Sequence, residues 1–473
     1  MKNLNKLTLL DVVEGLKTKK FTSLEVTKDC LDSIKKLDPR IKAFLTVTED
    51  LALEQAKEAD KEIKEKGAVI FEKRPLLGIP FACKDNFCTK GVLTTASSNI
   101  LNNFIPPYES TVTERLRKAG AVLLGKTNMD AFAHGSSTET SDFFPTRNPW
   151  DEKRMPGGSS GGSGAAVASD MCIFATGTET AGSIRVPAAW CGVTGMKPSY
   201  GRVSRYGVIA MASSTDSPGV IAKNVKDAAY VLKIIAGKDV NDATTTPAPV
   251  PDYLSQTFSL KGVKIGKPKS YFNLEMEKGV RESVEKAIQT LRDLGAEIID
   301  VDLMDPKYSI AVYTIIQRSE VSSNLARYDG IRFGNDRNHF GFEAKKRIML
   351  GTYALNASLS GAYPKAQRVR TLVLEDFRKA FSKVDLMVAP TMPCVAMKLG
   401  AGEKSSMFGE LMDVLAEPSS IAGIPAISIP CGLSEGLPVG IQFMANIQNE
   451  NKILEVANKF QEETEFHKLR PKI

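Results

Sequence analysis

The spacing of apolar residues along the chain predicts alternating helices and strands. Thr22 and Glu25 form a capping box ahead of apolar residues at helical spacing, and Pro39 is expected to stop this helix. A second helix is predicted over residues 51–63. These two helices are expected to pack over a sheet that starts near Leu76, within the apolar run LLGIPFAC.

The next units follow the order of helix, glycine and strand. Thr111 and Glu114 read as a second capping box, the helix is expected to end at Gly120, and residues 121–124 (AVLL) are predicted to form a strand. This order is typical of α/β folds.

The C-terminal half continues the same alternation after two irregular stretches. Residues 197–219 are turn-rich, and residues 239–252 are rich in Pro and Thr, which predicts a surface loop. A strand, a helix and a strand in succession then favour a mixed or parallel sheet covered by helices. The predicted elements are strands at 263–268, 297–303, 383–390 and 425–432, and helices at 280–294 and 452–463.

Composition narrows the class of protein. The chain has 473 residues, 42% of them hydrophobic, which is enough for a large core. Lys and Arg exceed Asp and Glu by 62 − 55 = 7, a modest excess that tolerates contact with RNA without arguing for it. Seven cysteines without paired CxxC spacing argue against a disulfide framework or a zinc cluster. No signal peptide or membrane-spanning run is visible, so a cytoplasmic protein is expected.

One stretch carries the candidate chemistry. Residues 156–187 contain two turns rich in glycine and serine around an apolar run at 165–175. Such turns present hydroxyl groups beside bare backbone N–H groups, which is what acyl transfer requires. Ser183 is the first candidate nucleophile and Ser159 the second. A phosphate loop would need a GK followed by Ser or Thr, and none follows.

A serine nucleophile needs a base. The literal GxSxG at 157–161 would fit an α/β-hydrolase with His339 or His467, but the preceding DEKRMP is a poor strand. A lysine kept neutral by burial is the other solution, and Lys84 at the end of a buried apolar run fits it. A salt bridge to Asp85 is the alternative explanation for this lysine.

At these three residues the chain resembles the amidase signature family. The matching segments are FACKDNF, PGGSSGGS and AGSIRVP. The resemblance implies that Lys84 deprotonates Ser159, that Ser159, preceded by a cis peptide, relays the proton from Ser183, and that Ser183 attacks an amide carbonyl. The backbone N–H groups of Thr180, Ala181, Gly182 and Ser183 would form the oxyanion hole. No metal site is expected.

The resemblance runs nearly end to end, which favours a single α/β domain over 1–473 with a central mixed β-sheet covered by helices on both faces. Its expected parts are N-terminal helices at about 8–65, a catalytic core at about 75–230, the loop at 239–252 and a C-terminal part at about 260–473.

Within the family, segments such as KRIMLGTYAL and KAQRVRTL are similar to the A subunits of glutamyl-tRNA(Gln) amidotransferases. That resemblance implies glutamine hydrolysis, with ammonia passed to a B subunit that amidates Glu-tRNA(Gln) using ATP, and a small C subunit that clamps the two. ATP and Mg would be used by the partner, so no cofactor is expected in this chain. Arg347 and Asp413 would bind the α-carboxylate and α-ammonium of glutamine. Asparagine as a donor and Asp-tRNA(Asn) as a target are left open.

The sequence also departs from the family. TETAGSIRVP stands where SDTGGSIRQP is usual, and NMDAFAHG replaces NMDEFAMG. A free-standing amidase and an inactive scaffold on the same fold therefore stay as alternatives. The unusual residues are Thr178, Glu179, Ala181, Val186 and Ala131.

Overall fold

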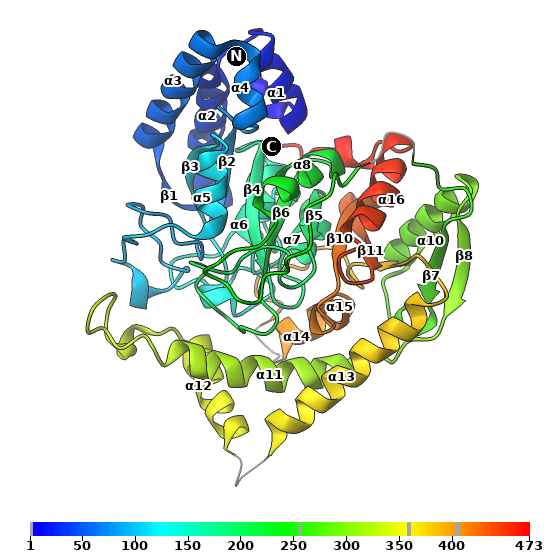
Figure 1. Ribbon diagram of the computed structural model, residues 1–473. Coiled ribbons are helices and arrows are strands. Elements are labelled where there is room, and N and C mark those ends of the chain that lie inside the picture. The colour runs from blue at the N-terminus through cyan, green and yellow to red at the C-terminus, as the bar shows by residue number, and fades with distance from the viewer. Residues whose placement is uncertain (1–2, 255–257, 357–360, 403–406) are drawn as a thin grey trace.

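A mixed β-sheet runs through the computed structural model, which describes residues 3–254, 258–356, 361–402 and 407–473 (Figure 1). Within these residues eleven strands form one sheet, in the order β1-β3-β2-β4-β6-β5-β10-β11-β9-β7-β8. The pairs β2–β3, β2–β4 and β7–β8 are parallel, whereas β4–β6, β5–β10 and β10–β11 are antiparallel. The expected mixed sheet is thereby confirmed. The strands are β1 Phe44–Val47, β2 Pro80–Lys84, β3 Val122–Thr127, β4 Phe174–Glu179, β5 Thr194–Lys197, β6 Ser217–Ala222, β7 Lys264–Pro268, β8 Glu297–Val301, β9 Leu386–Pro390, β10 Ala426–Ser434 and β11 Leu437–Ala445.

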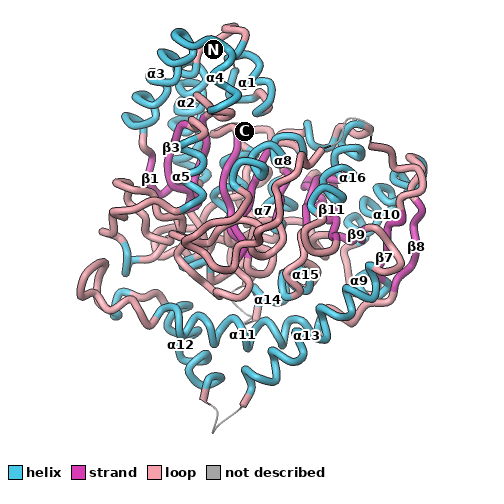
Figure 2. The backbone as a smooth tube through the Cα atoms, in the orientation of Figure 1, coloured by secondary structure: helices cyan, strands magenta, loops and turns pink. Residues whose placement is uncertain are grey.

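Helices cover both faces of this sheet. In one layer α6 and α7 pack together and against the central strands, and in the other α8 and α16 do the same, while α11, α12 and α13 lie below the sheet (Figures 1 and 2). The α-helices are α1 Leu9–Lys17, α2 Ser23–Ile41, α3 Glu49–Lys66, α4 Ile70–Lys73, α5 Thr111–Lys118, α6 Gly161–Ala168, α7 Arg185–Cys191, α8 Val225–Ile235, α9 Lys269–Phe272, α10 Lys278–Asp293, α11 Lys307–Leu325, α12 Phe342–Leu355, α13 Ala362–Phe381, α14 Phe408–Met412, α15 Glu417–Ile421 and α16 Glu450–Glu462.

The N-terminal helices match the predicted pattern except at their ends. The capping box of Thr22 and Glu25 starts α2, as expected. Pro39 does not stop α2, which continues to Ile41. A proline in the last turn removes only one helical N–H, and the helix ends where Lys42 takes a left-handed conformation (φ 60°).

Two further boundaries were predicted wrongly. The side chain of Ser110, not that of Thr111, caps α5 by accepting from the Thr113 N–H. The sheet begins at β1, ahead of Leu76, because the four-residue β1 pairs with β3 as an edge strand. So short a strand carries almost no periodic signal of its own.

The C-terminal part contains the predicted β7, α10, β8, β9, β10 and α16. β7 and β8 are parallel, as the order of strand, helix and strand indicated. Strand β11 and helices α9 and α11–α15 were not predicted. Residues 239–252 form the expected irregular stretch, and residues 151–156, directly before Gly157, form no strand. No helix of the described residues is long and apolar enough to cross a membrane.

Gly120 makes the close approach between α5 and the turn before β2. Its φ is +94°, and a Cβ there would lie 2.6 Å from the Cα of Leu77. Gly91 also has a positive φ (+77°), but a Cβ there would meet nothing within 4 Å.

We expect Gly120→Ala to lower the free energy of unfolding by about 1–3 kcal/mol more than Gly91→Ala, because both substitutions strain the backbone but only the first also forces an overlap. Denaturant titration of the two variants measures the difference. Equal losses would show that the contact with Leu77 relaxes freely.

Candidate active site

Lys84 is the last residue of β2 and is fully buried. Its Nζ lies 2.8 Å from Ser159 Oγ, 2.8 Å from Ser160 Oγ and 2.8 Å from Thr178 Oγ1, and 3.2 Å from the Thr178 carbonyl. The alternative of a salt bridge to Asp85 is wrong, because Asp85 pairs with Lys126 instead, 3.6 Å away. The parallel strands β2 and β4 bring Lys84 and Thr178 to the same end of the sheet.

The two neighbouring serines have different roles in this geometry. Ser160 Oγ donates to the Thr178 carbonyl at 3.3 Å, which leaves it as an acceptor for the lysine. Within the described residues Ser159 Oγ contacts only Lys84, so its proton can move to the lysine. The peptide bond between Gly158 and Ser159 is cis, as the family resemblance implied.

Burial prepares Lys84 to act as a base. Loss of water lowers its pKa to about 7, and the carboxylates of Asp130, Asp216 and Glu179 oppose this shift only in part. A neutral amine donates two hydrogen bonds and accepts one. With Ser160 and Thr178 as acceptors, the lone pair is directed to the Ser159 hydroxyl.

Ser183 lies in the turn between β4 and α7. Its carbonyl accepts from the Ser160 N–H at 3.1 Å, which ties this turn to the lysine cluster. Within the described part of the chain, the N–H groups of residues 180–183 donate no hydrogen bond, whereas those of Ile184 and Arg185 donate to Glu179. These four N–H groups make no hydrogen bond to the described residues, as the predicted oxyanion hole requires. Ala181 does not have a positive φ, so its methyl group causes no backbone strain.

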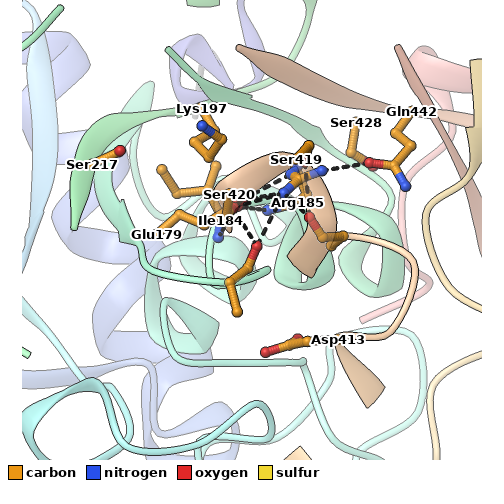
Figure 3. A network of polar contacts seen from close by, with 12 residues as sticks. Glu179, Ile184, Arg185, Lys197, Ser217, Asp413, Ser419, Ser420, Ser428 and Gln442 are labelled. Carbon is orange, nitrogen blue, oxygen red and sulfur yellow. Dashed lines mark hydrogen bonds and ion pairs between the residues drawn. The ribbon is translucent and has the colours of Figure 1, made fainter. Parts of the chain in front are cut away.

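A buried ion pair holds the base of this turn (Figure 3). Glu179 accepts from the Arg185 guanidinium at 2.8 Å and from the Ile184 N–H at 2.9 Å. Ser420 donates to the Ala181 carbonyl at 2.6 Å, and Arg185 also donates to Gln442. The Glu179 carboxylate thus accepts from both the backbone and a side chain of the residues that follow Ser183, which fixes the turn that carries Ser183.

Asp413 lies against the nucleophile turn. A Cβ on Gly182 would lie 2.7 Å from Asp413 Oδ1, and Asp413 Oδ2 accepts from Ser136 Oγ at 2.9 Å. Arg347 is buried on α12, where its Nε donates to Glu343 at 2.7 Å. Helix α12 packs against the short helix η4, Ala131–Ala133. The structure therefore places Asp413 directly at the turn and Arg347 beside the 130–138 segment.

The other departures from the family fit their surroundings. Val186 is buried in a small apolar cluster with Trp190, and Ala131 is buried in η4. Thr178 keeps the hydroxyl that contacts Lys84. His339 is half exposed and bonded to Asp336, and the pKa of His467 is lowered to about 4 by burial. No contact joins either histidine to the described serines of this site.

Sequence reasoning missed three residues of this site. Ser160 and Thr178 contact Lys84 directly, and Ser136 supports Asp413. The adjacent serines in GGSSGG were the only available signal for Ser160. The described residues contain no group of His, Cys, Asp and Glu able to hold a metal ion.

A buried lysine hydrogen-bonded to a serine that follows a cis peptide is the arrangement that the amidase resemblance implied. The sequence profile of the family described as Amidase matches residues 25–454, and the chain belongs to this family.

The chain is 48% identical to the A subunit of glutamyl-tRNA(Gln) amidotransferase from Carboxydothermus hydrogenoformans, over 99% of both chains. It is 50% identical to the protein of the same name from Caldanaerobacter subterraneus subsp. tengcongensis, over 97% of each. The crystal structure of the corresponding A subunit from Thermotoga maritima superposes with a TM-score of 0.82 at 41% identity, covering 97% of this chain and 94% of that one.

We expect the pKa of Lys84 to set the pH dependence of turnover. Only the neutral amine accepts the Ser159 proton, so kcat/KM for glutamine should rise about tenfold per pH unit below about 7 and level off above it. A pH–rate profile measures this. Lys197 is a matched control, because burial also lowers its pKa to about 7 while, among the described residues, its Nζ donates only to the Pro198 carbonyl. The Lys197→Met variant should still lose kcat/KM as the pH falls below about 7. If this pH dependence disappears in that variant, the assignment of Lys84 as the base is contradicted.

Proposed function

We propose that this chain is the glutaminase subunit of a tRNA-dependent amidotransferase. It hydrolyses glutamine and supplies the ammonia with which a partner subunit converts Glu-tRNA(Gln) to Gln-tRNA(Gln) at the expense of ATP. The observation that carries the amidase chemistry is the 2.8 Å contact of the buried Lys84 Nζ with Ser159 Oγ. The particular reaction is supported by the full-length likeness to proteins named as the A subunit of such an enzyme.

The Lys84–Ser159 contact supports the first step of the proposed proton path, and the family resemblance supports the second. Lys84 takes the proton of Ser159, Ser159 takes that of Ser183, and Ser183 Oγ forms a bond to the carboxamide carbon of glutamine. The oxygen that becomes negative is held by the N–H groups of Thr180, Ala181 and Gly182. Returning the proton to the nitrogen releases ammonia and leaves a glutamyl ester on Ser183. Water then attacks this ester by the same path and releases glutamate.

Recognition of glutamine is assigned to two charged groups. Asp413 binds the α-ammonium and Arg347 the α-carboxylate. The support for Asp413 is its place against Gly182, and for Arg347 its burial on α12 next to the 130–138 segment.

The partners are proposed on the same basis. The relatives' name describes one subunit of an enzyme that acts on glutamyl-tRNA(Gln). We infer B and C subunits for this chain, with ATP and Mg bound by the B subunit and no cofactor in this chain. The cytoplasmic location expected from the sequence stays a prediction. The runner-up is a free-standing amidase, which the shared fold with a peptide amidase from Stenotrophomonas maltophilia supports (29% identity, TM-score 0.82).

Ser183→Ala should lower ammonia release from glutamine by at least about 1,000-fold, because it removes the nucleophile. Ser169→Ala is the control: this serine is also buried, its hydroxyl has no hydrogen-bond partner among the described residues, and it lies at the end of α6 away from Lys84. It should keep turnover near that of the wild type. Normal release by a folded Ser183→Ala protein would refute the mechanism.

The same assay separates the two candidate functions. The chain is purified from its own host and ammonia release is measured with and without ATP and glutamate-charged tRNA. Stimulation, together with two co-purifying chains, supports the amidotransferase. Hydrolysis of assorted amides without stimulation or partners supports the free-standing amidase.

Asp413→Asn should raise KM for glutamine by roughly 10- to 100-fold, because the negative charge that pairs with the α-ammonium is lost. Butyramide, which lacks the α-ammonium, should show little change in KM. Steady-state kinetics with both substrates measures the contrast. Similar losses for the two amides would remove Asp413 from substrate recognition and leave it a support for the nucleophile turn.

A further inference from the structure

His134 is a buried histidine with no polar partner among the described residues. It is 1% exposed, and neither Nδ1 nor Nε2 has a hydrogen-bond partner in that part of the chain. Leaving a buried polar group without a partner costs stability. An apolar residue of similar size would avoid that cost at this position, so a ligand is the simplest explanation for the imidazole.

The segment that carries His134 touches the catalytic centre. A Cβ on Gly158, at the cis peptide, would lie 2.1 Å from Asp130 Oδ2 and 2.5 Å from the Ser137 backbone nitrogen. Ser136, two residues after His134, donates to Asp413. His134 therefore belongs to a short segment fixed between the catalytic cis peptide and the group proposed to hold the α-ammonium.

The same segment contains backbone strain. Phe132 and Ala133, immediately before His134, both have left-handed conformations, with φ of 52° and 64°. Residues without a glycine's freedom adopt such angles at a cost, and they concentrate at functional sites. The Phe132 ring packs against His134 with 5.9 Å between ring centroids, and against Tyr328 and Phe340. This packing fixes the position of the imidazole.

The charge near His134 indicates which ligand it would take. Arg347, whose Nε also donates to Glu343, lies on α12 against η4, and its positive charge adds to burial in holding the pKa of His134 well below the usual value. The imidazole is then neutral and offers one N–H donor and one acceptor. A cationic ligand would be repelled by Arg347, whereas a carboxylate would be attracted by Arg347 and could accept from the imidazole N–H.

We propose that His134 is a substrate-binding residue that, together with Arg347, holds the α-carboxylate of the amino-acid amide. This inference rests on the proposed function and adds a specificity-determining residue to it. His134 takes no part in proton transfer to Ser183, because its role is to donate a hydrogen bond to a group that does not react.

The test compares His134→Met, which removes the donor, with His134→Gln, which keeps a side-chain N–H. The proteins are purified with any co-purifying subunits. For glutamine, His134→Met should raise KM about tenfold or more with kcat changed less than twofold, and His134→Gln should stay within about threefold of the wild-type KM. For butyramide, which has no carboxylate, the KM values of all three proteins should agree within about twofold.

A thermal melt supplies the second readout. Because methionine leaves no unpaired polar atom, the ligand-free His134→Met protein should have a Tm equal to or above that of the wild type. Glutamine should raise the Tm of this variant less than it raises the Tm of the wild type. A lowered Tm without ligand would show that His134 is structural and would overturn the inference. So would an unchanged KM for glutamine, or an equal rise for both amides.

Different results would contradict the proposed function and the role of His134. If the wild-type protein neither hydrolyses glutamine nor gains Tm from it, the glutaminase assignment is wrong and the role of His134 falls with it. If the wild-type protein is an active glutaminase and His134→Met matches it, only the role of His134 is wrong.

Discussion

The removal of Lys84 from water is the constraint on which the rest of the site depends. An exposed lysine is protonated at neutral pH and cannot accept a proton, whereas burial lowers its pKa to about 7. A buried amine also needs hydrogen-bond partners, and Ser159, Ser160 and Thr178 supply them. These residues come from β4 and from the loop before α6, so the sheet and its helices must assemble before the base exists. The site is therefore a product of the whole fold, not of one local motif.

Three carboxylates lie near this lysine, yet they do not cancel the lowering of its pKa by burial. Asp130, Asp216 and Glu179 all favour its charged form, yet each is engaged elsewhere. Glu179 is paired with Arg185, Asp216 accepts from Thr180 and from two backbone N–H groups, and Asp130 accepts from Thr138 and Thr140. Their negative charge is shared with these donors, so desolvation remains the largest effect on the lysine. Each of these carboxylates also fixes a turn of the active site, which joins electrostatics to positioning.

The sequence predicted the parts of this molecule that have strong local signals. The period of apolar residues located α2, α10 and α16, and the resemblance of three short motifs located Lys84, Ser159 and Ser183. Prediction from the sequence failed where local signals do not determine the structure. Pro39 lies in the last turn of α2, where a proline removes only one helical hydrogen bond, and β1 exists because β3 offers an edge. Strand β11 was not predicted, because it is buried along its length and does not alternate polar and apolar residues. Ser160 and Ser136 could not be assigned because every serine in a glycine-rich loop looks alike until its partner is known.

The residues that depart from the family pattern fall into groups according to the residues that surround them. The side chains of Ala181 and Val186 are buried and have no polar atom, so these two departures add no new polar group to the site. Thr178 and Glu179 keep the chemical groups that matter, a hydroxyl for Lys84 and a carboxylate for Arg185. The 130–138 segment is different: there an imidazole replaces an apolar side chain in a fully buried position beside a guanidinium. A sequence that places polar groups where packing would prefer apolar ones loses stability, and such a loss is retained where the group has a ligand to bind. The role proposed for His134 links variation at this segment to substrate recognition, whereas Thr178 and Glu179 keep the groups that contact Lys84 and Arg185.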